Sequence, residues 1–193
     1  MKNKAKILID MDGVVADFVG GICKAHNREN PYEKGFTGYQ IEEAWGITTD
    51  EFWKVTDNVE FWDGLDKFEW ADELIEHCEN LVGIENMAFC TAPSRNPLCV
   101  VGKSMWLDCY FPKVKRIFTR EKYFCANPQT ILIDDTDPKI EKFYEHGGIG
   151  VTFPQPWNQA TYDYLNIGGL GSSGFDSVLY AIDGAVDRIN KTI

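Results

Sequence analysis

Ile7-Leu8-Ile9-Asp10-Met11-Asp12-Gly13 lies close to the N-terminus and decides how the rest of the sequence is interpreted. The three aliphatic residues predict a short buried strand, which Asp10 follows directly. Gly13 permits a sharp bend after the second acid, Asp12. Taken alone, an Asp-x-Asp-Gly sequence is typical of an ordinary capped turn. The function of this stretch therefore depends on the residues that the fold brings beside it.

Short apolar segments of this kind recur along the chain and alternate with helical patterns. Apolar residues return at helical spacing over residues 71–82 and again after Asp137-Pro138, where Asp137 is expected to cap a helix and Gly147-Gly148 to end it. This alternation predicts a doubly wound α/β fold with a mainly parallel sheet, in which ligands bind beyond the carboxyl ends of the strands. The predicted strands are residues 6–9, 87–90, 130–133 and 149–153.

Residues 18–66 interrupt the alternation. The segment is rich in aromatic residues and contains no convincing strand, whereas residues 41–45 and 52–55 suit short helices. Thr48 and Glu51 have the spacing of a capping box, the reciprocal pair that opens a helix. We therefore expect a small helical cap domain at residues 18–66, inserted into a core domain made of residues 1–17 and 67–193.

The C-terminal part carries two further signals. Residues 168–174 are rich in glycine and serine, which predicts a flexible connector. Val178, Ile182, Ala185 and Ile189 follow at helical spacing, so we expect a final amphipathic helix that packs on the sheet.

Composition and charge exclude several classes of protein. With 193 residues, 44% hydrophobic and 25% charged, the chain has the makeup of one globular domain or of a core with an insertion. A net charge of -11 disfavours binding of polymeric nucleic acid, whereas a small phosphorylated ligand needs only local positive charge. Neither a signal peptide nor a membrane-spanning run is recognisable, so we expect a cytoplasmic protein without membrane contact.

Three predicted strands end in reactive groups, namely Asp10, Thr91 and the pair Asp134-Asp135. Because the carboxyl ends of parallel strands meet at one edge of a sheet, these groups should lie together. Several carboxylates at one edge repel one another unless a hard cation lies among them, and oxygen ligands of this kind favour Mg²⁺.

The same residues suit phosphoryl transfer. A carboxylate such as Asp10 can attack phosphorus once a metal ion and a cation screen the phosphoryl oxygens, and the product is an aspartyl-phosphate. Asp12 could protonate the leaving alkoxide and later deprotonate a water molecule. Thr91 and the backbone amides around Ala92 suit a phosphoryl oxygen.

These motifs resemble those of the haloacid dehalogenase superfamily, and within it the sequence is similar to the 5'(3')-deoxyribonucleotidases. The resemblance covers most of the chain, through about Asn158. The matching motifs, in order, are Asp10 to Phe18, Cys90-Thr91-Ala92-Pro93, Lys103 with Trp106 three residues later, and Ile131-Leu132-Ile133-Asp134-Asp135.

The resemblance implies a role for each carboxylate. Asp10 would be the nucleophile and Asp12 the general acid/base. Mg²⁺ would be held by Asp10, Asp135 and the backbone carbonyl of Asp12, with support from Asp134. Phosphatase members have a second aspartate at the position of Asp12, whereas dehalogenase-type members do not, which favours hydrolysis of a phosphate ester.

The resemblance also implies which residues bind the phosphate. The main phosphate-binding residues would be Thr91, Ala92 and Lys103. Two further residues, Arg120 and Lys122, would also approach the site. By itself, Lys103 in the middle of a predicted helix is more typical of a solvated surface. Lys122 is the competing phosphate lysine, and we rank Lys103 ahead of it.

Substrate choice is expected to lie in the cap. In the related nucleotidases aromatic residues stack on the base, and Phe18 and Trp62 correspond to two of these positions. Two departures weaken the match: Ala92 stands where the nucleotidases often have serine, and residues 30–49 align poorly.

The expected function is therefore Mg²⁺-dependent hydrolysis of a deoxynucleoside 5'-monophosphate. A phosphatase for a sugar phosphate or another small phosphate, and a phosphate-binding module without turnover, are the alternatives. The family resemblance also suggests a homodimer, although no stripe of residues specifies its interface.

Overall fold

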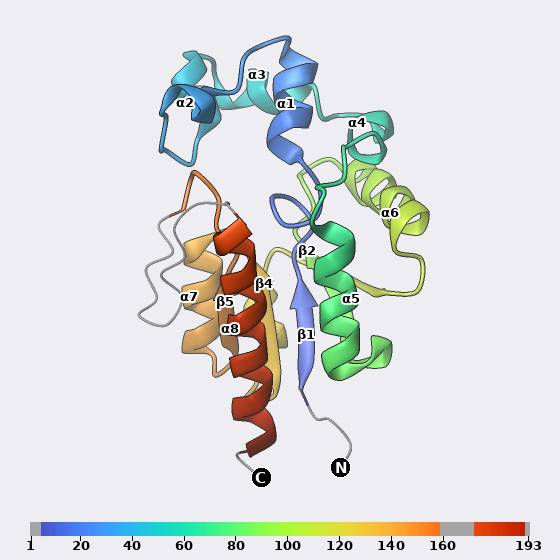
Figure 1. The fold of residues 1–193 in the computed structure, drawn as a ribbon. Coiled ribbons are helices and arrows are strands. Elements are labelled where there is room, and N and C mark those ends of the chain that lie inside the picture. The colour runs from blue at the N-terminus through green and yellow to red at the C-terminus, as the bar shows by residue number, and fades with distance from the viewer. Residues whose placement is uncertain (1–4, 159–171, 192–193) are drawn as a thin grey trace.

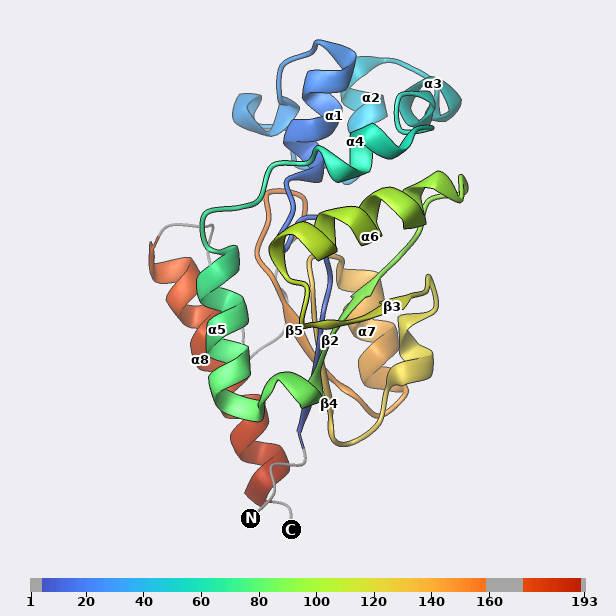
Figure 2. The ribbon, with the colours of Figure 1, turned by 90° about the vertical axis from the view of Figure 1, so that its right-hand side faces the viewer.

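The computed structural model describes residues 5–158 and 172–191. Within these residues, parallel strands form one five-stranded sheet in the order β3-β2-β1-β4-β5 (Figures 1 and 2). The strand that opens the chain thus lies at the centre of the sheet. The strands are β1 (Lys6–Ile9), β2 (Met87–Thr91), β3 (Lys115–Phe118), β4 (Thr130–Asp134) and β5 (Ile149–Thr152).

The predicted fold class and all of the predicted strands are confirmed, whereas β3 was not predicted. This strand pairs only with β2, at one edge of the sheet. Its sequence begins with Lys115 and Arg116, and none of its residues is fully buried. An edge strand with one polar half lacks the continuous apolar run that indicates a buried parallel strand.

Helices cover both faces of the sheet. On one face α5 and α8 pack against each other, and Ile7 and Ile9 of β1 share a hydrophobic cluster with Ile182. On the other face α7 packs on β4 and β5, and Leu8 shares a second cluster with Phe143. Successive strand residues point to opposite faces, so β1 contributes to both cores. The helices outside the cap region are α5 (Ala71–Val82), α6 (Leu98–Tyr110), α7 (Asp137–Glu145), α8 (Ser172–Lys191) and the 3₁₀ helices η2 (Ile84–Asn86) and η3 (Lys122–Cys125).

The final helix is confirmed, and the four apolar positions that predicted it are buried. The predicted connector is only partly testable, because residues 168–171 lie outside the described residues. Residues 172–174 belong to α8, so the prediction of a connector was wrong there. Gly174 is buried, and packing of the helix on the sheet outweighs the low helix propensity of glycine and serine. Among the described helices, none is long and apolar enough to cross a membrane.

The start of α7 differs by one residue from the prediction. Asp137 is the first helical residue rather than the cap, and Thr136 takes the cap position. Pro138 lies in the first turn, where its missing N–H has no helical partner to lose. The predicted end is correct, since Gly147 adopts a φ of 85° just after the helix.

A layer of short helices lies beyond the carboxyl ends of the strands, at the top of Figure 1. The predicted capping box is present, because Thr48 and Glu51 each bind the backbone N–H of the other. Val19, Ile22 and Phe52 form the small core of this layer. The layer consists of α1 (Phe18–His26), η1 (Pro31–Lys34), α2 (Ile41–Trp45), α3 (Thr49–Lys54) and α4 (Val59–Asp63).

Two chain segments join this layer to the sheet, and they lie side by side. Ala16 forms an isolated antiparallel bridge with Lys67. The backbone N–H of Asp17 donates to the Asp66 carbonyl at 2.8 Å, and that of Phe68 donates to the Val15 carbonyl at 3.0 Å. The chain therefore passes from the sheet to the helical layer and returns from it at one place, directly after the loop that contains Asp12.

Helices α4 and α6 approach each other closely at Gly102. A Cβ atom on Gly102 would lie 2.6 Å from the Cβ of Trp62 and 2.6 Å from the carbonyl oxygen of Val59. The second of these neighbours is backbone and cannot rotate away. The helical layer can thus lie this close to α6 only because residue 102 has no side chain.

We predict that Gly102→Ala lowers the free energy of unfolding by about 1–3 kcal/mol, the usual cost of overpacking. Gly184→Ala is the matched control, because a Cβ there meets nothing within 4 Å and the position is an exposed helix interior. This control should be neutral or should stabilise by up to about 1 kcal/mol. Urea denaturation measures both, and equal stability of the two variants would contradict the close-approach argument.

Candidate active site

The carboxyl ends of the three central strands bring the candidate residues together. Strand β1 lies between β2 and β4, and the backbone N–H of Asp10 donates to the Ile133 carbonyl at 2.9 Å. Asp10, Thr91 and Asp134 thus follow or end adjacent strands at the same edge. All three residues are buried.

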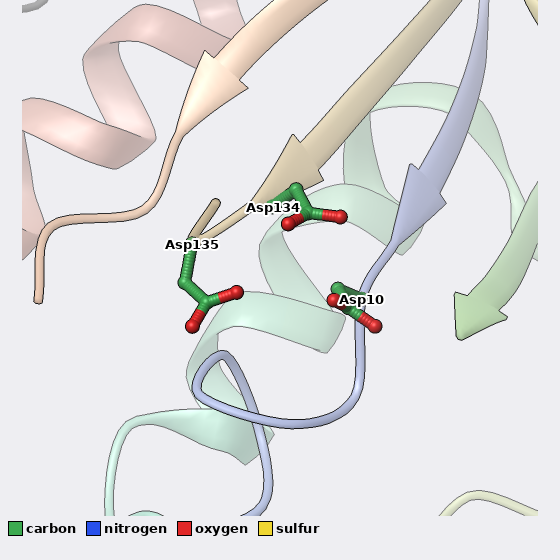
Figure 3. A group of neighbouring side chains, drawn as sticks. All are labelled: Asp10, Asp134 and Asp135. Atoms are coloured by element: carbon green, nitrogen blue, oxygen red, sulfur yellow. The ribbon is translucent and has the colours of Figure 1, made fainter. Parts of the chain in front are cut away.

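Asp10, Asp134 and Asp135 form a cluster of buried carboxylates. Each offers an oxygen atom within 4.8 Å of the oxygens that the other two offer, and Figure 3 shows the three side chains gathered around one space. Burial and the neighbouring Asp134 raise the pKa of Asp135 to about 8. Ionisation of all three carboxylates is thus opposed by burial and by their mutual repulsion, and the donors of the cluster are all oxygen atoms. The cluster could therefore hold a hard divalent cation such as Mg²⁺.

Lys122 is buried between two of these carboxylates. Its Nζ atom lies 2.7 Å from Oδ2 of Asp10, and it also forms an ion pair with Asp134. Burial would lower the pKa of Lys122, but the two carboxylates raise it above its ordinary value. The ammonium group is thus retained and neutralises part of the cluster.

Lys103 is fully buried on the other side of the site. Its Nζ atom donates to Oδ2 of Asp12 at 2.5 Å, to Oγ1 of Thr91 at 2.8 Å and to the Ala92 carbonyl at 3.0 Å. These three acceptors match the three hydrogens of the ammonium group. The structure thus brings together both predicted lysines, with Lys103 beside Asp12 and Lys122 beside Asp10.

Lys139, in the first turn of α7, was not predicted. Its Nζ atom lies 3.4 Å from Oδ2 of Asp10 and 3.5 Å from Oδ1 of Asp134. Burial would lower its pKa, but Asp134 and Asp10 raise it well above the ordinary value. The sequence signal was available, because a lysine in the first turn of a helix that begins just after Asp134-Asp135 faces the same edge of the sheet.

The pKa values of the two acids of the opening motif are shifted in opposite directions. Burial would raise the pKa of Asp10, but Lys122 and Lys139 outweigh it and hold the pKa below the ordinary value. Burial raises the pKa of Asp12, and Asp10 adds to the rise against the opposing effect of Lys103. Asp10 is thus kept as an anion, whereas Asp12 holds a proton more readily than an ordinary aspartate.

One oxygen of Asp12 is left without a partner. Lys103 binds Oδ2, whereas Oδ1 is buried and forms no hydrogen bond with any described residue. A buried oxygen of this kind is costly unless a ligand satisfies it. Oδ1 is therefore the oxygen of Asp12 that can still accept a hydrogen bond.

Arg120 forms no ion pair with the described carboxylates of the cluster. Its side chain is exposed, and its Nε atom donates to the Pro93 carbonyl at 2.9 Å. It thus fastens the loop that follows Thr91. Ala92 contributes its carbonyl to Lys103 and is only partly buried.

The two predicted aromatic residues stack on each other. The rings of Phe18 and Trp62 lie 5.7 Å apart between centroids with an interplanar angle of 20°. Trp62 is 2% exposed and donates its indole N–H to the Thr56 carbonyl, whereas Phe18 is partly exposed. The Nζ atom of Lys103 lies 5.0 Å from the Trp62 ring centroid. Trp62 thus connects the helical layer, to which α4 belongs, with Lys103.

Sequence reasoning also missed the loop that follows β5. Gln155 donates from Nε2 to the Gly13 carbonyl at 2.6 Å, and the Trp157 indole N–H donates to Oδ2 of Asp135 at 2.9 Å. Asn158 donates to the Asp135 carbonyl at 2.7 Å. These residues belong to the Pro-Gln-Pro-Trp-Asn sequence after a strand end, which was a recognisable signal for a loop at this edge of the sheet.

We predict that Mg²⁺ raises the melting temperature of the wild-type protein, by about 5–10 °C at 100 times its dissociation constant. Asp135→Asn should remove this shift. In EDTA the variant should melt higher than the wild type, because burial and Asp134 penalise ionisation of Asp135 and an amide does not carry that penalty. Asp176→Asn removes an exposed acid of α8 and is the control. An undiminished Mg²⁺ shift in Asp135→Asn would contradict the assignment of the cluster.

Comparisons with known proteins identify the family and the fold of the chain. A family model described as "5' nucleotidase, deoxy (Pyrimidine), cytosolic type C protein" matches residues 3–168. No curated protein matches the chain. A haloacid dehalogenase-like family hydrolase from Xanthomonas campestris is 11% identical with a TM-score of 0.58, over 98% of this chain and 95% of its own. A haloacid dehalogenase-like hydrolase from Streptococcus pneumoniae is 13% identical with a TM-score of 0.52, over 95% and 99%.

At these identities the solved structures show the fold alone, whereas the family model spans most of the chain. The fold brings the buried aspartates and their lysines together at the carboxyl ends of the central strands. The chain belongs to the cytosolic type C family of deoxy (pyrimidine) 5' nucleotidases, and its fold is that of haloacid dehalogenase-like hydrolases.

Proposed function

We propose that the protein hydrolyses deoxynucleoside 5'-monophosphates such as dUMP and dTMP, with Mg²⁺ and through an aspartyl-phosphate intermediate. One observation carries the proposal. Asp10 is held as an anion by Lys122 at the carboxylate cluster, while Asp12 has a raised pKa and a buried oxygen without a partner. A nucleophile and a proton donor are thus present two residues apart.

In the first step, a carboxylate oxygen of Asp10 would attack the phosphorus atom. The bond between phosphorus and the 5' oxygen breaks, and the leaving alkoxide takes the proton of Asp12. The raised pKa of Asp12 supports this role, because the acid must carry a proton before the step.

In the second step, a water molecule would attack the phosphorus atom of the aspartyl-phosphate. Asp12, now deprotonated, takes a proton from that water, and the bond between phosphorus and the Asp10 oxygen breaks. Inorganic phosphate leaves, and both acids return to their starting states. One water molecule is consumed for each ester bond cleaved.

The negative phosphoryl oxygens need positive partners that do not take part in bond cleavage. We propose that Lys103 and Thr91 bind them with the backbone near Ala92, and that Lys122 and Arg120 add charge. Mg²⁺ bound by Asp10, Asp135 and the Asp12 carbonyl, with Asp134 in support, would screen the phosphoryl charge and orient the group. The oxygen-only cluster supports this metal.

We further propose that residues 18–66 form the cap that selects the nucleoside. Phe18 would meet the base, because it is the partly exposed member of the pair, and Trp62 would support the ring of Phe18 from below. A cytoplasmic location and a homodimer are further proposals. The location rests on the description of the matched family, and the homodimer rests on family resemblance alone.

We predict that Asp10→Asn abolishes phosphate release, because an amide is not a competent nucleophile. Phosphate release from dUMP, dTMP and a panel of sugar phosphates, each with Mg²⁺ and with EDTA, tests the reaction and the substrate class together. Turnover of nucleotides no faster than that of sugar phosphates would overturn the substrate claim. Retained activity in Asp10→Asn would overturn the covalent mechanism.

We predict that Phe18→Leu raises KM for dUMP by about 5- to 150-fold, the equivalent of about 1–3 kcal/mol of base stacking, with a smaller change in kcat. This variant is a cleaner probe than Trp62→Ala, which would open a cavity costing about 3–5 kcal/mol. Tyr180→Leu, at an exposed position on α8, is the control. An unchanged KM in Phe18→Leu would show that Phe18 does not contact the base.

A further inference from the structure

The loop after β5 closes over the edge of the sheet that carries the carboxylate cluster. Gln155 donates a hydrogen bond to the Gly13 carbonyl at 2.6 Å. Asn158 donates to the Asp135 carbonyl at 2.7 Å and to the Phe153 carbonyl at 2.8 Å. The loop is thereby fastened to the segments that follow both β1 and β4. These two segments carry the carboxylates of the cluster, so the loop restrains them relative to each other.

Within this loop, Trp157 contacts the cluster directly. Its Nε1 atom donates to Oδ2 of Asp135 at 2.9 Å, and the hydroxyl of Thr136 donates to Oδ1 at 3.1 Å. Each carboxylate oxygen accepts one hydrogen bond and keeps electron pairs for another partner. An indole N–H is only a donor, so it can orient Asp135 without competing for a cation.

The side chain of Asp135 has little freedom in this position. A Cβ atom on Gly13 would lie 2.3 Å from Oδ2 of Asp135 and 3.1 Å from Cζ2 of Trp157. Gly13 has a φ of 73°, which also favours glycine there. The carboxylate therefore lies in a narrow space between the Gly13 backbone and the indole.

The indole is also held from the side of the helical layer. The ring of Tyr32, in η1, lies 5.1 Å from that of Trp157 between centroids, and Trp157 packs against the small core of the layer. The backbone N–H of Tyr32 is bonded to the side chain of Asn30, which starts η1. Trp157 is therefore held by the helical layer, and it in turn holds the carboxylate of Asp135.

We infer that Trp157 is a positioning residue for the divalent cation. By donating to Oδ2, the indole selects the orientation in which Asp135 faces Asp10 and Asp134, and its contact with Tyr32 connects this orientation to the helical layer. The inference rests on the proposed function in that it takes the carboxylate cluster as the metal site. It assigns no role to Trp157 in bond cleavage.

The test compares Trp157→Phe with Trp70→Phe. Both substitutions remove one indole N–H, and Trp70 is matched in exposure class and in hydrogen-bond length, since it donates to the Val14 carbonyl at 2.9 Å. Binding of Mn²⁺ in place of Mg²⁺ is measured by electron paramagnetic resonance of the free ion. We expect the Mn²⁺ dissociation constant to rise about 10- to 100-fold in Trp157→Phe and to change less than twofold in Trp70→Phe.

Two further readouts separate positioning from general loss of structure. The melting temperature of each variant is measured with EDTA and with Mg²⁺, so that the metal-induced shift is compared with the variant's own baseline. In dUMP hydrolysis, the Mg²⁺ concentration for half-maximal rate should rise in Trp157→Phe, while kcat at saturating Mg²⁺ should change far less.

Unchanged Mn²⁺ binding in Trp157→Phe would overturn the inference, as would a wild-type protein that binds no Mn²⁺. Weaker binding in this variant together with a normal control supports it. If Mn²⁺ binding weakens as expected but the wild type hydrolyses no nucleotide, the positioning role stands and the proposed function fails. The two conclusions can thus be separated.

Discussion

Three aspartate carboxylates share one buried edge of the sheet, and the need to balance their charge governs the structure around them. A buried charge without a partner is strongly unfavourable, so positive groups must reach the edge from the surrounding elements. Lys122 arrives from η3 and Lys139 from the first turn of α7, and both lie within ion-pair distance of Asp10 and Asp134. Asp135 forms no ion pair with a lysine among the described residues, and this imbalance makes the cluster suited to a cation.

The lysines also act differently on the two acids of the first motif, whose pKa values are shifted in opposite directions. Lys122 and Lys139 act on Asp10, whereas Lys103 hydrogen-bonds Asp12 through one oxygen only. If every lysine were on one side, the acids would share one environment and could not divide the roles of nucleophile and proton donor. Their separation follows from the sheet order, because β1 has β2 and Thr91 on one side and β4 on the other.

Much of this arrangement could be predicted from the sequence, because buried parallel strands leave a strong apolar signal and their ends carry Asp10, Thr91 and the Asp134-Asp135 pair. Strand β3 could not, since an edge strand with a polar half lacks that signal. Trp157 was missed for another reason. Its role depends on a hydrogen bond to a residue 22 positions away in the chain, which no local pattern indicates. Lys103 was found only through family resemblance, because a lysine inside a helix is usually solvated.

In the proposed function, contacts between the helical layer and the sheet edge connect substrate selection to the chemistry. Phe18 lies six residues after Asp12 and stacks on Trp62, and the Trp62 ring in turn lies beside the ammonium group of Lys103. On the metal side, the layer reaches Asp135 through the indole of Trp157. A ligand that shifts the helical layer would therefore disturb both sides of the site at once. The missing side chain at Gly102 lets α4 lie close enough to α6 for the Trp62 ring to approach Lys103.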